Sequence, residues 1–399
     1  MTEVVLNSGD TAWVLASAAL VLLMTPGLAL FYGGMVRTKS VLNMMMMSMV
    51  TIGIVSVLWV LYGFKLAFGS EANSPWYGAI ASSNLENTVS DFTNNGGVYP
   101  IPLLAFAAFQ LMFAIITPAL ISGSIADRTK FSAWAIFVTV WVTLVYFPVA
   151  HWVFAFGNKV GDVVSGAGFL AAKGVEDFAG GTAVHINAGA AGLALAIVLG
   201  KRVGWRRDSM RPHSLPLVLL GAALLWFGWF GFNAGSALGA NATAALALIN
   251  TQVATGAALI GWLLFEKFRD GHATSLGAAS GAVAGLVAIT PACAFVAPWA
   301  AVVIGLIAGA LCSSAVGLKY KFNFDDSLDV VGVHLVGGIW GCLSIGLFGT
   351  KTVNELGGDG LFYGGGAHLL GVQAFGAFIV MVYSFVVTLI IGFALEKTI

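Results

Sequence analysis

Two histidines in long apolar stretches each follow an aspartate by eight residues. Asp177 precedes His185, and Asp326 precedes His334. An aspartate at a helix start accepts hydrogen bonds from the first free backbone amides and suits the positive end of the helix dipole. Eight residues at a rise of about 1.5 Å place each histidine about 12 Å deeper than its aspartate. Because half of a hydrocarbon core is about 15 Å, this spacing predicts both imidazoles near the middle of a bilayer.

Two neutral imidazoles at that depth could relay a proton or line a polar file, because one ring can donate a hydrogen bond while the other accepts it. A single buried histidine is as often a packing residue, so the matched depth of the two is what favours a function. A metal site would require a third or fourth ligand, and no Cys, Asp or Glu is predicted at that depth. A bis-histidine haem is a conceivable alternative, which Soret absorbance would reveal. We expect no metal and no other cofactor.

Aromatic side chains at helical spacing form a second pattern. Phe109 and Phe113 are four residues apart and share one face of a helix. Trp229 and Phe232 belong to an aromatic-rich stretch later in the chain. Plain packing is the simpler interpretation, and the functional one is a narrow apolar gate beside a cation-binding aromatic vestibule. The sequence contains no Walker loop, nucleophile elbow or zinc-protease motif, so we do not expect an enzyme.

The composition shows which kind of element must position these residues. Of the 399 residues, 59% are hydrophobic and only 9% are charged, whereas soluble domains are about 25% charged. The chain is therefore expected to be an all-α polytopic membrane protein. Its 51 glycines favour helices that pack backbone to backbone. The three cysteines are an odd number without metal-type spacing, so we expect no disulfide framework.

Apolar runs of about 20 residues predict eleven transmembrane helices in a single domain, residues 1–399. The runs cover residues 12–35, 42–68, 100–122, 132–156, 180–199, 215–237, 244–265, 275–292, 299–318, 330–348 and 368–395. The first run is long and lacks a preceding basic region, so it is expected to be a retained span rather than a signal peptide.

The distribution of cations predicts the topology. With the N-terminus outside, all but four of the eighteen Lys and Arg residues fall on the cytoplasmic side; the four are Lys65, Lys159, Lys173 and Lys351. The positive-inside rule therefore predicts N-out and C-in. Helices five and ten then start from opposite faces, so their histidines can meet. Helices one to five (about 10–200) and six to ten (about 215–350) would form an inverted repeat, followed by helix eleven (about 366–395).

Five stretches in the same order resemble the Amt/Mep/Rh family of ammonium transporters, and specifically its Amt branch. They are TPGLALFYGG at 25–34, FQLMFA at 109–114, DFAGGTAVHINAG at 177–189, WFGFNAGS at 229–236 and DDSLD at 325–329, the last leading to His334. Together they span nearly the whole chain.

The resemblance implies a homotrimer in the cell membrane in which each subunit carries its own ammonium pore. His185 and His334 match the family's twin pore histidines, and Trp229 matches a lining residue beside them. Phe113 and Phe232 match a stacked gate. The outer recruitment site corresponds to Phe109, Phe113, Phe154 and Ser236. Asp177 matches a structurally required acid at the helix start, in agreement with the capping role expected for it and for Asp326.

Two departures from the family pattern change the expectations. Phe154 stands where the recruitment site usually has a tryptophan, and Trp152 lies about 200° away around the helix, so it should not substitute. Because tryptophan offers the best cation–π face, we expect weaker outer ammonium binding. The family usually continues into a cytoplasmic tail that helps contact a P-II-type signalling protein, whereas this sequence stops at Ile399. Regulation by a P-II partner is therefore doubtful.

The residues and the resemblance together predict net ammonium transport. An apolar gate penalises any bare charge, which ammonium escapes by losing a proton and potassium cannot. Whether the proton follows through the imidazoles decides between electrogenic transport, which we favour, and a passive ammonia channel. A third alternative is an ammonium sensor that signals to a cytoplasmic partner.

Overall fold

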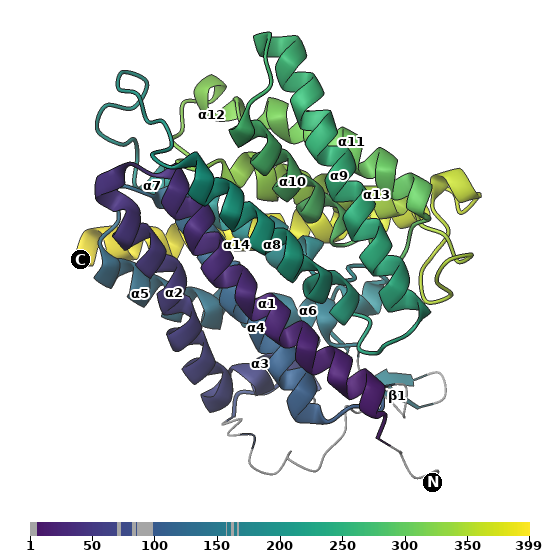
Figure 1. The fold of residues 1–399 in the computed structure, drawn as a ribbon. Coiled ribbons are helices and arrows are strands. Elements are labelled where there is room, and N and C mark those ends of the chain that lie inside the picture. The colour runs from purple at the N-terminus through teal and green to yellow at the C-terminus, as the bar shows by residue number, and fades with distance from the viewer. Residues whose placement is uncertain are drawn as a thin grey trace.

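The computed structural model describes residues 6–69, 73–81, 85, 99–156, 158–160, 163–165 and 167–399. Within these ranges the chain is almost entirely helical (Figure 1). An antiparallel hairpin of β1 (Asn158–Val160) and β2 (Val163–Ser165) lies in the loop after α6, and the sequence analysis did not predict it. The predicted fold class, an all-helical membrane protein, is confirmed.

The helices follow the predicted apolar runs. In chain order they are α1 (Ser8–Met35), α2 (Val41–Leu58), η2 (Trp59–Gly63), α3 (Phe64–Phe68), α4 (Leu103–Ile121), α5 (Phe131–Trp141), η5 (Val142–Tyr146), α6 (Phe147–Phe154), η7 (Gly181–Ile186), α7 (Asn187–Val198), α8 (Leu215–Gly235), α9 (Ala242–Asp270), α10 (Ser275–Ile289), α11 (Pro298–Ala315), α12 (Leu318–Lys321), η8 (Val331–Leu335), α13 (Val336–Phe348) and α14 (His368–Thr398). The segments η2, η5, η7 and η8 are π-helical turns inside longer helices. Short 3-10 turns occupy Thr38–Ser40, Ser122–Ile125, Ala171–Lys173 and Leu361–Tyr363.

Among the described residues, ten helical segments are long and apolar enough to cross a membrane, when each π turn is joined to its neighbouring α-helix. The eighth predicted span corresponds to α10, which is apolar but shorter, with 15 residues. The orientation of the helices in the bilayer stays a prediction. We call the face where α1, α7 and α11 end and α8, α10 and η8 begin the inner face; on the predicted topology it is cytoplasmic.

Polar side chains at the helix starts satisfy the first free amides. Asn7 accepts from the amide of Asp10 at 3.0 Å, and Asn241 accepts from that of Ala244 at 3.0 Å. Thr274 caps α10 in the same way. Such caps supply acceptors for donors that have no partner within the helix. The starts of α1, α9 and α10 are therefore encoded locally, beside the hydrophobic runs.

Glycines bring α1 and α8 together, so that one helix from each half of the chain lies directly against the other (Figure 1). A Cβ on Gly221 would overlap the backbone of Phe31, and one on Gly34 would lie 2.7 Å from the Ser214 carbonyl oxygen. Neither position has room for a side chain. The two halves are joined by backbone contact, as small-residue packing in membranes allows.

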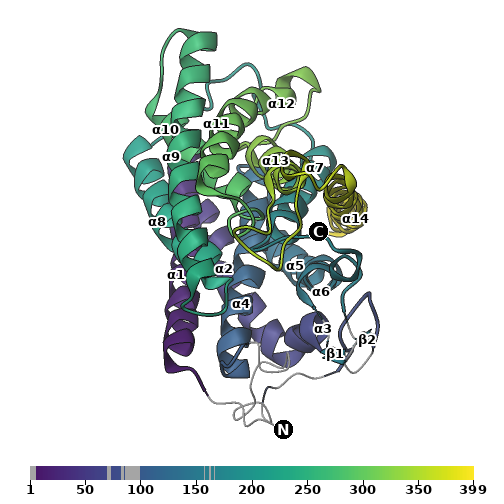
Figure 2. The same cartoon turned by 90° about the vertical axis from the view of Figure 1, so that its right-hand side faces the viewer.

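The segments that carry the histidines lie beside each other near the middle of the bundle. Figure 2 shows α7, α13 and α14 as neighbours, and η7 contacts both α13 and α14. A Cβ on Gly189 would come within 2.5 Å of the Leu335 backbone nitrogen. Because Gly189 lies one turn after His185, and Leu335 directly follows His334, this glycine lets the two segments cross close to the histidines.

Candidate functional site

The helix that bears His185 starts on a carboxylate. The side chain of Asp177 accepts from the amides of Gly180 at 2.8 Å, Gly181 at 2.6 Å, Thr182 at 2.7 Å and Ala183 at 3.2 Å, and also from the Thr182 hydroxyl. Gly180 has φ +122°, a conformation that L side chains rarely adopt, which turns the chain into the helix. One buried acid thus fixes the whole first turn.

The carboxylate at the start of the helix that bears His334 accepts fewer hydrogen bonds than that of Asp177. One carboxylate oxygen of Asp326 accepts from the amide of Val331 at 2.8 Å. The Lys319 ammonium donates to the Asp326 carbonyl at 3.2 Å and to the Asp329 carboxylate at 2.6 Å. Burial and the neighbouring charge of Asp329 raise the pKa of Asp326 above its ordinary value. The two helix starts are therefore built on the same residue type with different surroundings.

The two imidazoles meet inside the protein. Nδ1 of His334 and Nδ1 of His185 are 3.3 Å apart, and both rings are buried. Each histidine lies in a π-helical turn, η7 or η8. A hydrogen bond between two Nδ1 atoms requires that one ring donates and the other accepts. Because the two rings meet through their Nδ1 atoms, their Nε2 atoms are the two ends of a short polar link.

Aromatic rings continue from the histidines in a chain of close contacts. The ring of Trp229 stacks on His185 with centroids 5.4 Å apart, and the Trp229 indole donates to the Thr290 hydroxyl at 2.8 Å. Phe232 lies 6.1 Å from His185 and 4.2 Å from Phe113. Phe113 in turn lies 4.9 Å from Phe109. These residues come from α4, η7 and α8, and all are buried, so an unbroken row of aromatic rings leads from Phe109 to the histidines.

The remaining residues predicted for the outer site lie at helix ends. Ser236 follows α8, and its hydroxyl donates to the Phe232 carbonyl at 2.8 Å. Phe109 packs against Gly235, next to that serine. Phe154 is the last residue of α6 and is buried. Trp152 points elsewhere: its ring centroid is 4.6 Å from that of Tyr383 in α14, and its indole donates to the Trp76 carbonyl.

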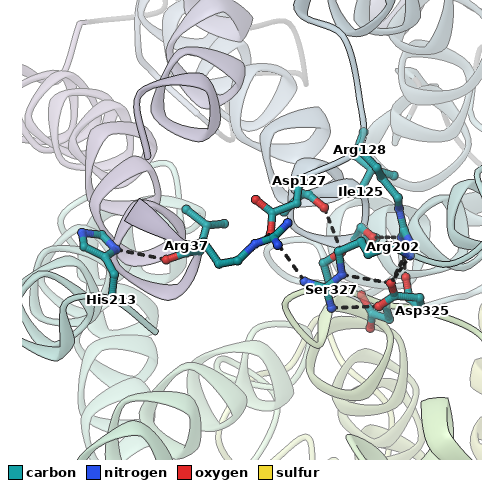
Figure 3. A network of polar contacts seen from close by, with 12 residues as sticks. Arg37, Ile125, Asp127, Arg128, Arg202, His213, Asp325 and Ser327 are labelled. Atoms are coloured by element: carbon teal, nitrogen blue, oxygen red, sulfur yellow. Dashed lines mark hydrogen bonds and ion pairs between the residues drawn. The ribbon is translucent and has the colours of Figure 1, made fainter. Parts of the chain in front are cut away.

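A charged network on the inner face was not predicted from the sequence (Figure 3). The Arg202 guanidinium and amide bond both oxygens of Asp325 at 2.8–2.9 Å, and Arg128 pairs with the same carboxylate at 3.0 Å. Asp127 accepts from Arg37 at 2.9 Å and lies 3.9 Å from Arg202. Burial lowers the pKa of Arg128 to about 10 despite these carboxylates. The network ties the chain just after α7, at Gly200 and Arg202, to Asp325, the residue before Asp326.

The only sequence signals for this network are the basic loop after 199 and the first acid of the DDSLD stretch. Neither signal names a partner, because Arg37, Asp127, Arg202 and Asp325 lie on four separate segments. His151 is also buried, and its ring nitrogens lie 2.8 Å from the Ala67 carbonyl and 2.9 Å from the Ser74 carbonyl. Among the described residues, no three His, Cys, Asp or Glu side chains are grouped so that they could hold a metal ion.

Residues 12–399 match the family model described as Ammonium Transporter Family. The chain belongs to the ammonium transporter family. An ammonium transporter of Mycobacterium tuberculosis is 56% identical over 98% of this chain and 86% of its own length. Amt1 of Archaeoglobus fulgidus is 41% identical, covering 99% of this chain and 94% of its own. The resemblance seen in the sequence is therefore confirmed.

Solved structures of family members share the fold. The crystal structure of Saccharomyces cerevisiae Mep2 is 34% identical, covers 96% of this chain and 87% of its own, and superposes with a TM-score of 0.85. A protein described as "Sensor Amt Protein" is 28% identical, covers 98% and 93%, and has a TM-score of 0.86. The chain is thus a multi-pass cell-membrane protein that transports ammonium, and it is not an enzyme.

Proposed function

We propose that each subunit conducts ammonium through its own pore, with the Phe113–Phe232 pair as a gate and the His185–His334 pair as the polar link beyond it. The observation that carries this proposal is the 3.3 Å contact between two buried imidazoles behind a continuous aromatic wall. A neutral molecule can follow such a path, whereas a bare cation loses its hydration with little in return.

The outer site would hold ammonium before it reaches the gate. Phe109, Phe113 and Phe154 offer ring faces, and Ser236 offers a hydroxyl oxygen. Ring faces attract a cation through their quadrupole, and a hydroxyl accepts a hydrogen bond from ammonium. Potassium shares the charge but has no proton to donate or to leave behind. Selectivity therefore arises in two steps, binding outside and deprotonation at the gate.

Ammonia then passes alongside the two imidazoles, while the proton is relayed from one imidazole ring to the other. The Nδ1–Nδ1 contact supports this relay, because a proton arriving at one Nε2 can be matched by release from the other ring. Transport is then electrogenic. The role of Trp229 is to hold the His185 ring by stacking, since its indole is itself anchored on Thr290. Asp177 and Asp326 position the helix starts and do not touch the substrate.

Solid-supported membrane electrophysiology on proteoliposomes tests the relay. We expect ammonium pulses to give currents in the wild type and potassium pulses to give none. His185→Ala and His334→Ala should lose the current while ammonia flux, followed as an internal pH change, persists. A current that survives the loss of His185 would refute the relay. Flux without any current in the wild type would favour a passive ammonia channel.

A sensor is the alternative from another class, and the similarity to the "Sensor Amt Protein" is the observation that favours it. Ammonium binding without measurable flux would support that function. We further propose from family membership that the chain forms a homotrimer of single-domain subunits, each with the inverted repeat at about 10–200 and 215–350. Light scattering in detergent tests the trimer. A P-II-type protein at the inner face is the remaining proposed partner, and pull-down with purified P-II protein tests it.

A further inference from the structure

A cavity of about 540 Å³ opens at the inner face, beside the ends of both histidine helices. The loop after α7 forms one side, and α12 with the residues before η8 forms the other. Six charged side chains line it: Arg202, Arg206, Arg211, Lys319, Asp208 and Asp329. Four cations against two acids give the cavity an excess of positive charge.

Some of these charged side chains already form ion pairs within the protein, and others do not. Arg202 is bound to Asp325, and Lys319 is bound to Asp329 at 2.6 Å. Arg206 and Arg211 form no ion pair within the part of the chain that the structure describes. Asp208 is the one remaining acid of the lining, so the positive excess resides on these two arginines.

The loop that carries the free arginines is folded against an aromatic pair. The rings of Trp205 and Tyr320 stack 6.1 Å apart at 14°. The Arg206 guanidinium lies 5.5 Å from the Trp205 ring centroid, and the Lys201 ammonium lies 5.1 Å from it. Backbone bonds from Arg207 and Asp208 to the Gly204 carbonyl, at 2.9 and 2.8 Å, close the turn. Because the cations rest on a fixed ring, less side-chain entropy is lost when they bind a ligand.

We propose that this cavity binds a phosphate-bearing anion, with Arg206 and Arg211 donating to its oxygens. Guanidinium groups match phosphate oxygens in paired, charge-assisted hydrogen bonds. The two arginines without an ion pair offer two separate guanidinium groups, which suit the several oxygens of a phosphate better than the two oxygens of a carboxylate. The Trp205 ring is already in contact with Lys201, Arg206 and Tyr320. The ligand therefore does not have to stack an aromatic ring on Trp205. A free phosphate compound and a phospholipid headgroup share this chemistry.

The position of the cavity gives the anion a consequence for transport. Arg202 follows the His185 helix, and Asp329 precedes the His334 helix, so the bound anion lies where the proposed path reaches the cytoplasm. Its negative charge offsets the positive excess that a leaving proton or ammonium ion would meet. We therefore expect larger ammonium currents when the anion is bound. This effect rests on the function proposed above, whereas the binding itself does not.

Titration of the purified protein in detergent with inorganic phosphate and with ATP, at constant ionic strength, tests the site. Trp205 reports occupancy through its fluorescence, and Trp205→Phe identifies its share of the signal. We expect Arg206→Ala and Arg211→Ala each to weaken binding at least about tenfold, as the loss of a charge-assisted hydrogen bond implies. Arg207→Ala is the matched control, because Arg207 is exposed on the same loop and does not line the cavity. Equal weakening in all three variants would overturn the proposal.

The lipid source is tested with the same variants in vesicles of phosphatidylcholine, with and without phosphatidylglycerol. A Trp205 signal that requires phosphatidylglycerol and is lost in Arg206→Ala and Arg211→Ala assigns the site to a headgroup, whereas binding of phosphate or ATP in detergent assigns it to a soluble anion. If none of the three probes gives a signal that depends on these arginines, the site does not exist. Normal ammonium currents in that case would leave the proposed transport function intact.

Discussion

Replacing Asp325 by asparagine should destabilise the protein far more than the loss of an ordinary surface charge. The carboxylate bonds Arg202 at 2.8–2.9 Å and pairs with Arg128 at 3.0 Å. The Asp325 side chain is 0% exposed, and those of Arg128 and Arg202 are 9% and 7% exposed. Asparagine keeps the shape of the side chain but leaves the buried Arg128 guanidinium without its paired carboxylate, and Arg202 with only Asp127 at 3.9 Å.

Breaking a buried ion pair from one side costs about 3–5 kcal/mol. Unfolding entropy is about 2.1 cal/mol/K per residue, so for 399 residues each kcal/mol lowers the melting temperature by about 1.2 °C. We therefore expect Asp325→Asn to lower the apparent melting temperature in detergent by about 4–6 °C. Tryptophan fluorescence on heating measures this directly. Asp325→Asn/Arg128→Gln should recover part of the loss, because it removes one of the stranded charges.

The matched control is Asp270→Asn, which breaks the Arg269–Asp270 pair at 2.6 Å, where the side chains are 42% and 40% exposed. Solvent screens such a pair, so this variant should melt close to the wild type. A melting temperature of Asp325→Asn as high as that of Asp270→Asn would refute the view that the inner-face network holds the histidine helices together.

Three further predictions follow from single sites. Phe154→Trp should raise the apparent ammonium affinity about two- to fivefold at low substrate, because tryptophan offers a better cation–π face. Trp152→Phe should leave the affinity unchanged, because Trp152 packs on Tyr383. Unchanged currents in Phe154→Trp would remove Phe154 from the outer site. Burial raises the pKa of Glu176 from 4.5 to about 7, so between these pH values the folded state keeps a proton that the unfolded state releases. The free energy of unfolding should therefore fall by about 3 kcal/mol as the pH rises from about 4.5 to 7. Melting curves across that range should show this slope, and Glu176→Gln should abolish it; a slope that persists in Glu176→Gln must come from another group. Gly221→Ala should destabilise by about 1–3 kcal/mol, because its methyl group would overlap the Phe31 backbone, whereas Gly256→Ala, with nothing within 4 Å, should be neutral or stabilising in thermal unfolding.

The sequence predicts the features of this fold that depend on local pattern. Hydrophobic runs predict the helices, and the Asp177–His185 and Asp326–His334 spacings predict which helices carry the polar centre. The π-helical turns around both histidines were not predictable, because an apolar, glycine-rich stretch has no sidedness from which a wider turn could be recognised. The structure shows these turns directly. The depth argument assumed a regular α-helical rise, so it holds only approximately there.

Features that join distant segments were also beyond the sequence. Arg202 and Asp325 are 123 positions apart, and no local rule pairs one arginine of a basic loop with one acid of an acidic stretch. His151 illustrates the same limit, because no local pattern pairs its ring nitrogens with the carbonyls of Ala67 and Ser74, which are 84 and 77 positions away. For the outer site, the sequence indicates which residues are available, and their roles stay proposals.

The close packing of α1 against α8 through glycines bears on which conformational changes this protein can use during transport. Transporters that expose a site alternately to each side do so by rocking one half of the molecule against the other. Here the two halves meet backbone on backbone at Gly34 and Gly221, where an added side chain would collide with the facing helix. Under the function proposed above, passage would depend on the rotation of single rings instead of the slow collective swings of a rocking cycle. Under that proposal, turnover would be governed by how readily each ion surrenders its proton, while the helices keep their positions.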